Sequence, residues 1–280
     1  MHASKLAWFY EQNWQTQYLI FAIVCLILFN LIFFLVRRFV HFDVLKKHHD
    51  LAGFVIGTLG TLYSVLLGFS IVSAQERLGL IVSKVNEEAY LSADLYRTTL
   101  VFPQDTRAHM QNSILSYIDS VIHDEWPLMQ QQLESPITLE KLEQLWALFY
   151  QFQPQTEQEK IWFNQAITTL TALNSARLER IYSSWDTLNT LSQLALFGGG
   201  LVLISFLLFF GTENLLSQLA INGLFIIYLA FMMYVVYSLD KPFSNSQPIQ
   251  PKAYEIIYNY YTQTRGKPLS PEIPPLPKRN

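Results

Sequence analysis

The segment 51–97 contains no proline and changes character halfway along. It begins as an apolar stretch, LAGFVIGTLGTLYSVLLGFSIVS, and continues as a charged amphipathic one, AQERLGLIVSKVNEEAYLSADLYR. A single α-helix of this length would extend roughly 70 Å, at about 1.5 Å per residue. Because a hydrocarbon core is about 30 Å thick, half of such a helix must stand in water. The segment therefore predicts a helix that carries side chains from lipid depth into a polar domain.

The composition agrees with a membrane protein. Of the residues 51% are hydrophobic and only 15% are charged, whereas soluble domains carry about 25% charged residues. Three further apolar segments, 18–39, 191–211 and 215–239, are each near the ~20 residues that cross a bilayer as a helix. The fold class that follows is an all-α integral membrane protein, with four transmembrane helices in two pairs flanking a helical extramembrane domain.

The chain divides by composition into four parts. Residues 1–73 hold the first pair of spans (near 18–39 and 51–73), residues 74–190 a net acidic polar domain, residues 191–239 the second pair (near 191–211 and 215–239) and residues 240–280 a proline-rich tail. Prolines in the polar domain mark probable boundaries of helices. They predict helices near 104–126, 137–152 and 156–190, the last continuing into the third span. The end of the tail, PLSPEIPPLPKRN, is expected to be extended or disordered, as a flexible terminus or as a proline-rich ligand.

Two faces can be assigned to the long helix at about 100° of rotation per residue. With Glu76 at zero, one face runs within about 20° of that line and is apolar first and acidic later; its members are Thr58, Val65, Phe69, Ser83, Glu87 and Asp94. A second face, about 120° away, gathers small residues that let helices approach closely in lipid; these are Gly53, Gly57, Gly60, Ser64 and Gly68.

The first face has two interpretations. In several assembled copies it would line a central pore, with Val65 and Phe69 as a constriction that gates by dewetting and Glu76, Glu87 and Asp94 as an acidic vestibule. Alternatively the apolar members face lipid or a neighbouring span, and the acidic members form an ordinary solvated surface.

The orientation in the membrane is left open by two conflicting charge tallies. Arg37, Arg38, Lys46 and Lys47 in the first loop place that loop in the cytoplasm by the positive-inside rule. The opposite orientation gathers seven other cations on the inner side, namely Lys5, Arg77, Lys84, Arg177, Arg180, Lys241 and Lys252.

Several motifs in combination resemble a bacterial bestrophin-like membrane family. They are AGFVIGTLGTLYSVLLGFSIVSAQER, VNEEAYLSADLYR, DEWPLM and LDKPFS, the last followed by Asn245 where the family usually has glycine. The segment 64–69 is similar to the pore segment of bestrophins, which are pentameric anion channels, and Arg77 is placed like the arginine that follows it. The resemblance puts the three-residue neck at Thr61, Val65 and Phe69. The chain lacks the paired prolines before the segment and a recognisable calcium-binding acidic cluster, so calcium gating is not implied.

Other chemistry has little support. No nucleophile elbow, P-loop, dinucleotide fingerprint or HExxH motif occurs, so we expect neither enzyme activity nor a cofactor. His123, Asp124 and Glu125 are metal-ligand types, but residues adjacent on a helix point in different directions, and a helix end at Pro127 with a buried Trp126 is the alternative. We therefore assign no metal site. The net charge of -3 suggests no nucleic-acid partner.

Two functions remain at this stage. The first is a homo-oligomeric ion channel of a bacterial inner membrane, a pentamer if the resemblance extends to assembly, with the second span lining the pore and the lipid bilayer and inorganic ions as partners. The alternative is a non-conducting membrane anchor or scaffold whose helical domain binds a protein partner.

Overall fold

The computed structural model describes residues 13–39, 49–185, 187–208, 214–244 and 248–264, and these residues form helices and connecting turns without a strand. Within this described part, four helices are long and apolar enough to cross a membrane. The chain separates into two compact units. Unit 1 comprises Met1–Leu78 and Thr187–Pro248, and unit 2 comprises Gly79–Asp186 and Ile249–Asn280.

The long proline-free segment is one helix, α4, from His49 to Thr98. At about 1.5 Å per residue it extends roughly 75 Å, so the prediction of a continuous helix over 51–97 is confirmed. Its apolar part belongs to unit 1 and its amphipathic part to unit 2.

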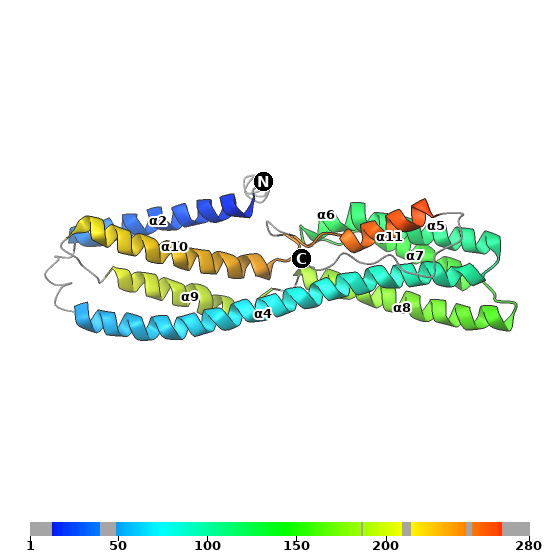
Figure 1. Ribbon diagram of the computed structural model, residues 1–280, viewed down its shortest axis with the longest axis horizontal. Helices are drawn as coiled ribbons and strands as arrows, with labels where there is room; N and C mark the ends of the chain where they lie inside the picture. The colour runs from blue at the N-terminus through cyan, green and yellow to red at the C-terminus, as the bar shows by residue number, and fades with distance from the viewer. Residues whose placement is uncertain (1–12, 40–48, 186, 209–213, 245–247, 265–280) are drawn as a thin grey trace. The chain divides into compact units, whose positions relative to one another are not determined.

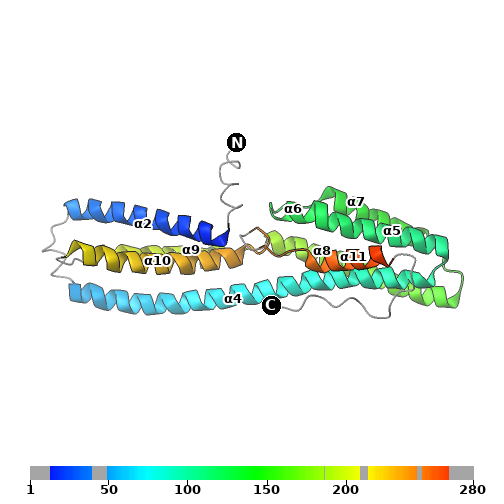
Figure 2. The same ribbon diagram turned by 45° about the horizontal axis from the view of Figure 1, so that its top comes forward.

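Unit 1 contains three more apolar helices: α2 (Trp14–Phe39), α9 (Thr190–Leu207) and α10 (Leu215–Asp240), with α2 running along α10 (Figures 1 and 2). Asparagines are the N-cap residues of α9 and α10. Asn189 accepts a hydrogen bond from the amide of Leu191, and Asn214 accepts one from the amide of Leu216. These helices coincide with the apolar segments that the sequence predicts as spans.

The core of unit 1 is built on a close approach of α4 and α9. Tyr63 packs with Leu67, Leu196, Leu203 and Leu229, and its hydroxyl donates to the carbonyl of Leu196 at 2.9 Å. A Cβ at Gly199 would come within 2.8 Å of the Tyr63 ring, so only glycine fits there without a shift. A second cluster, with Phe29, Phe33, Leu207 and Ile226, joins α2 to α9 and α10.

Unit 2 packs the second half of α4 against helices that are shorter than α4 (Figure 1). In chain order they are η1 (Thr99–Val101), α5 (Gln104–Ser120), η2 (Val121–Glu125), α6 (Trp126–Met129), α7 (Pro136–Gln151), α8 (Glu157–Trp185) and α11 (Lys252–Gln263). Side chains cap the N-termini of two of these helices. Ser135 caps α7 ahead of Pro136, and Thr156 and Glu159 form a reciprocal capping box at the start of α8.

The chain is helical over the predicted range 104–126, but the helix is not regular throughout and does not end before Pro127. Residues Val121–Glu125 form a π-helix, and α6 continues through Pro127 to Met129. Pro127 does not end the helix because the second position of a new helical turn needs no amide donor.

The continuous helix predicted from 156–190 into the third span is also wrong. Helix α8 ends at Trp185 and α9 begins at Thr190, with residues 187–189 not helical. The tail contains a further helix, α11, which was not predicted because prolines surround it in the sequence. Residues 268–280, the possible proline-rich ligand, lie outside the described residues.

Candidate functional site

The predicted pore-lining residues of α4 are all exposed in the single chain: Thr58, Thr61, Val65, Phe69, Glu76, Glu87 and Asp94. The side chains of Val65 and Phe69 are 53% and 70% exposed, which is high for large apolar groups. The hydroxyls of Thr58 and Thr61 donate to the carbonyls of Phe54 and Gly57 one turn back, so they need no other acceptor.

The opposite side of α4 is the packed side in both units. In unit 1 it carries Tyr63 and Leu67, and in unit 2 it carries Val85 and Ala89. Counted at about 100° per residue, these residues and their buried neighbours centre roughly 160° from the line through Glu76. The exposed face is thus the side of the helix that the chain itself leaves uncovered.

At three glycines of the small-residue face, the described residues leave open space. A Cβ built on Gly57, Gly60 or Gly68 meets no atom within 4 Å. Packing between α4 and α9 uses Tyr63 against Gly199 and Gly200 instead. The space beside these α4 glycines is therefore open to a neighbour outside the chain.

Two cations of α4, Lys84 and Arg77, pair with carboxylates. Within unit 2, Lys84 bridges Glu87 and Glu179, each at 3.1 Å. Within unit 1, Arg77 donates to the Asp240 carboxylate and to its backbone carbonyl, both at 2.9 Å. The positive charge of Arg77 is therefore paired with the carboxylate of Asp240.

Asp240 gives a structural account of the LDKPFS motif. It lies at the end of α10, is nearly buried, and accepts from Arg77 and, at 2.6 Å, from the amide of Leu188. One carboxylate thus fastens α4, the segment before α9 and the end of α10. Phe243 of the same motif is also buried.

A buried ionic cluster, which sequence reasoning missed, holds unit 2 together. Arg180 donates from Nε to Glu88 Oε2 and from Nη2 to Glu125 Oε2, both at 2.6 Å, and all three residues are fully buried. Arg177 pairs with Glu125 and, at 3.0 Å, with the half-exposed Glu134. The cluster ties α4 to η2 and α8, and buried charges persist only when paired in this way.

Aromatic side chains enclose this ionic cluster. The Tyr117 hydroxyl donates to Glu88 Oε1 at 3.0 Å, and the Trp126 ring lies 5.3 Å from the Arg180 guanidinium carbon. Burial first, and the Glu88 carboxylate second, raise the pKa of Tyr117 and of Tyr254 well above their usual value. Both phenols therefore stay neutral, and Tyr117 donates to Glu88.

The side chains of His123 and Glu125 point in different directions, as predicted for neighbouring residues on a helix. Glu125 points into the ionic cluster, while the exposed His123 faces Asp119 at 3.2 Å. No group of three metal-ligand side chains occurs among the residues that the structure describes. Trp126 is buried, as the alternative interpretation expected, and its Nε1 donates to the carbonyl of Ile249.

Comparisons with known proteins place the fold. Residues 23–254 match the bestrophin-like domain. A crystal structure of a bacterial bestrophin homologue from Klebsiella pneumoniae, carrying a point mutation, superposes with a TM-score of 0.66 at 13% identity, covering 88% of this chain and 99% of that one. A second crystal structure, of a membrane protein variant, gives 0.66 at 12% identity with the same coverage.

The sequences of curated proteins give no match. The solved structures establish the fold, and the matched domain spans most of the chain, from the first apolar helix to the start of α11. This all-helical membrane protein therefore belongs to the bestrophin-like family.

Proposed function

We propose that the protein is a homo-oligomeric ion channel of a bacterial inner membrane, with its four spans arranged as two pairs and α4 lining the pore. The family's known members are ion channels, which supports conduction. The observation that carries the assignment is the uncovered face of α4. It is exposed in both units, from Thr58 to Asp94, while the opposite side of the helix is packed.

The constriction in this proposal is apolar. Val65 and Phe69 are one helical turn apart on the uncovered face, and Thr61 lies one turn before Val65. Repeated around a symmetry axis, such side chains form a ring that water leaves readily, and ions cannot pass a dry ring. Conduction would then require the ring to widen.

Assembly in this proposal uses the open glycines. A face that flanks the pore-lining side of a helix meets the adjacent subunit in any closed ring. Gly57, Gly60 and Gly68 leave room there for another helix to approach closely. The family resemblance suggests five copies.

Selectivity in this proposal favours cations. Glu76, Glu87 and Asp94 are exposed on the pore-lining side. Lys84 pairs with both Glu87 and Glu179, and Arg77 pairs with Asp240, so the acidic groups outnumber the cations there. A vestibule lined by carboxylates raises the local concentration of cations.

The first experiment measures mass and conductance together. Native mass spectrometry of the purified protein gives the subunit number, and planar bilayers give single-channel current. We expect a closed oligomer with unitary currents. A monomer, or an oligomer that never conducts, would refute the channel assignment.

A second experiment tests the glycine interface. Gly60→Leu fills the open space on α4 and should shift the protein toward monomer on size-exclusion chromatography with light scattering. Gly198→Leu is the matched control, because Gly198 also lies in an apolar helix with no atom within 4 Å of its Cβ but belongs to α9. Equal behaviour of the two variants would reject the interface.

A further inference from the structure

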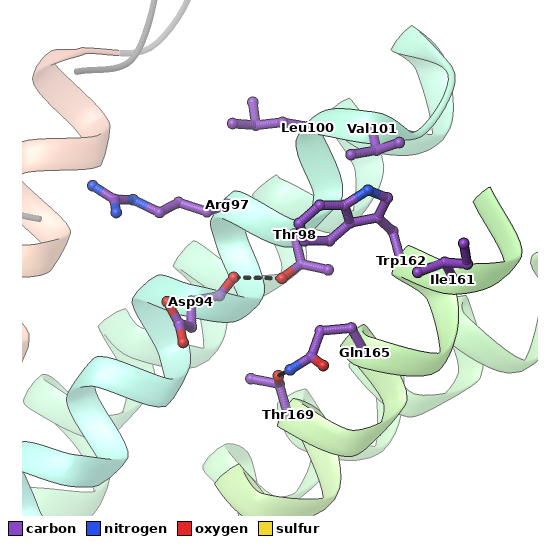
Figure 3. Close-up of a pocket in the computed structure, with 9 residues that line it drawn as sticks. All are labelled: Asp94, Arg97, Thr98, Leu100, Val101, Ile161, Trp162, Gln165 and Thr169. Carbon is purple, nitrogen blue, oxygen red and sulfur yellow. Dashed lines mark hydrogen bonds between the residues drawn. The ribbon is translucent and has the colours of Figure 1, made fainter. Parts of the chain in front are cut away.

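Unit 2 contains a cavity between the end of α4 and the first turns of α8 (Figure 3). Its volume is about 660 Å³, within the range of about 300–1,000 Å³ typical of small-molecule sites. The residues around it combine one carboxylate and one guanidinium with an indole, two hydroxyls, an amide and aliphatic groups. They are Asp94, Arg97, Thr98, Leu100, Val101, Ile161, Trp162, Gln165 and Thr169.

The charge that the cavity presents is negative. Asp94 is exposed and forms no ion pair within the described residues. Arg97 extends to the other side of α4, away from Trp162 (Figure 3), where it lies near Tyr261. Burial raises the pKa of Tyr261 to about 12, and the Arg97 guanidinium acts on that pKa in the opposite direction. The positive charge of Arg97 is thus directed toward α11.

Two of the polar groups around the cavity already hydrogen-bond within the chain. The Thr98 hydroxyl donates to the carbonyl of Asp94 at 2.8 Å, and the Gln165 amide donates to the Thr169 hydroxyl at 3.4 Å. The Asp94 carboxylate remains as a strong acceptor. A cation is the complementary ligand.

The other wall of the cavity is apolar. Trp162 lies across Thr98 (Figure 3), and its side chain is 40% exposed, next to Ile161 at 68%. Leu100 in η1 continues this wall. An indole face attracts a cation and also covers hydrocarbon, so the wall suits an organic group better than a bare metal ion.

We propose that this cavity binds organic ammonium ions, with the cationic group at Asp94 and the hydrocarbon part against Trp162. Because Asp94 belongs to the uncovered face of α4, an occupant would also obstruct cation flow; this consequence, unlike binding itself, rests on the proposed channel function.

Binding is tested without any current. Isothermal titration calorimetry of the full-length protein in lipid nanodiscs compares benzyltrimethylammonium with benzyl alcohol and benzoate. We expect saturable binding of the ammonium ion that weakens as sodium chloride is raised, and no binding of the two other probes. Binding of benzoate in preference would mean an arginine-directed anion site, and absence of any binding would equally overturn the proposal.

Two variants locate the site. Asp94→Asn should weaken binding about fivefold, and Trp162→Leu about three- to fivefold. The controls are Asp105→Asn, an exposed carboxylate on α5, and Tyr150→Leu, an exposed aromatic group on α7; neither lines the cavity. Binding that is unchanged in both test variants would reject the site, and the salt dependence in the unmutated protein remains decisive if a variant is poorly folded.

Block is measured separately in bilayers. Benzyltrimethylammonium should reduce unitary current in the unmutated protein and less so in Asp94→Asn. Current without block, in a protein that binds the probe, would separate the cavity from the conduction path. Binding in a protein that never conducts would reject the channel assignment and leave the cavity intact.

Discussion

Replacing Glu88 by glutamine should destabilise unit 2 strongly, because this residue carries charge inside the buried ionic cluster. Its carboxylate accepts from Arg180 at 2.6 and 3.0 Å and from the Tyr117 hydroxyl at 3.0 Å. Breaking a buried ion pair from one side costs about 3–5 kcal/mol. For a protein of this size that lowers the melting temperature by roughly 6–20 °C.

The neighbouring residue supplies the control. Glu87 is 54% exposed and pairs with Lys84 on the surface, where an ion pair contributes about 1 kcal/mol or less. Melting of the purified protein, followed by tryptophan fluorescence, should therefore separate Glu88→Gln from Glu87→Gln by several degrees. Equal melting temperatures for the two variants would refute the role given to the cluster.

A double substitution tests the electrostatic origin of the loss. Glu88→Leu alone leaves Arg180 with Glu125 as its remaining carboxylate partner. Adding Arg180→Met removes the excess charge, and Arg177 still matches Glu125. Since apolar replacement of a buried pair is often neutral, the double variant should melt higher than Glu88→Leu. A lower melting temperature would point to lost packing instead of unpaired charge.

Three further outcomes are expected. Phe69→Ala should widen the constriction and raise unitary conductance in bilayers, while Leu216→Ala, an exposed position on α10, should not; equal currents would argue against the neck. Glu76→Gln should lower the permeability of cations relative to anions, read from reversal potentials in asymmetric salt, and an unchanged ratio would remove that carboxylate from the vestibule. Because burial raises the pKa of Tyr261 to about 12 in the folded protein, above about 10 when unfolded, its contribution to stability is complete below pH ~10 and is lost as the pH rises toward 12. Tyr261→Phe should flatten the fall in melting temperature over that range, and an equally steep fall would refute it.

The long helix was predictable because its signals are local. Two signals predict α4 to within a few residues: the segment lacks proline, and its apolar stretch is followed by an amphipathic one. The three other spans follow from length and hydropathy in the same way. The uncovered face of α4 also agrees with the periodicity around Glu76. Periodicity alone does not tell which side of a helix the chain packs against.

Helix α11 shows where prolines mislead. Pro251 stands directly before the first helical residue, a position where proline suits a helix. The apolar spacing of Tyr254, Ile257 and Tyr261, at three and four residues, was the available signal, and all three side chains are buried.

The ionic cluster was not predictable from one sequence. Glu87 and Glu88 are the same residue type at adjacent positions, yet one is exposed and the other fully buried. What distinguishes them is Arg180, which meets Glu88 only through the packing of α8 on α4. The arginines at 177 and 180 share one side of α8, and two cations on a buried side were the weak signal that a carboxylate partner exists.

The discontinuous make-up of the two units has a consequence for biosynthesis. Glu88 and Arg180 are synthesised well before Tyr254, which is buried beside them, because the last two spans lie between in the chain. Helices α9 and α10 are therefore synthesised before α11 can complete unit 2. Until then the ionic cluster lacks the buried side chain of Tyr254. Unit 2 is thus completed only after all four candidate spans have been synthesised.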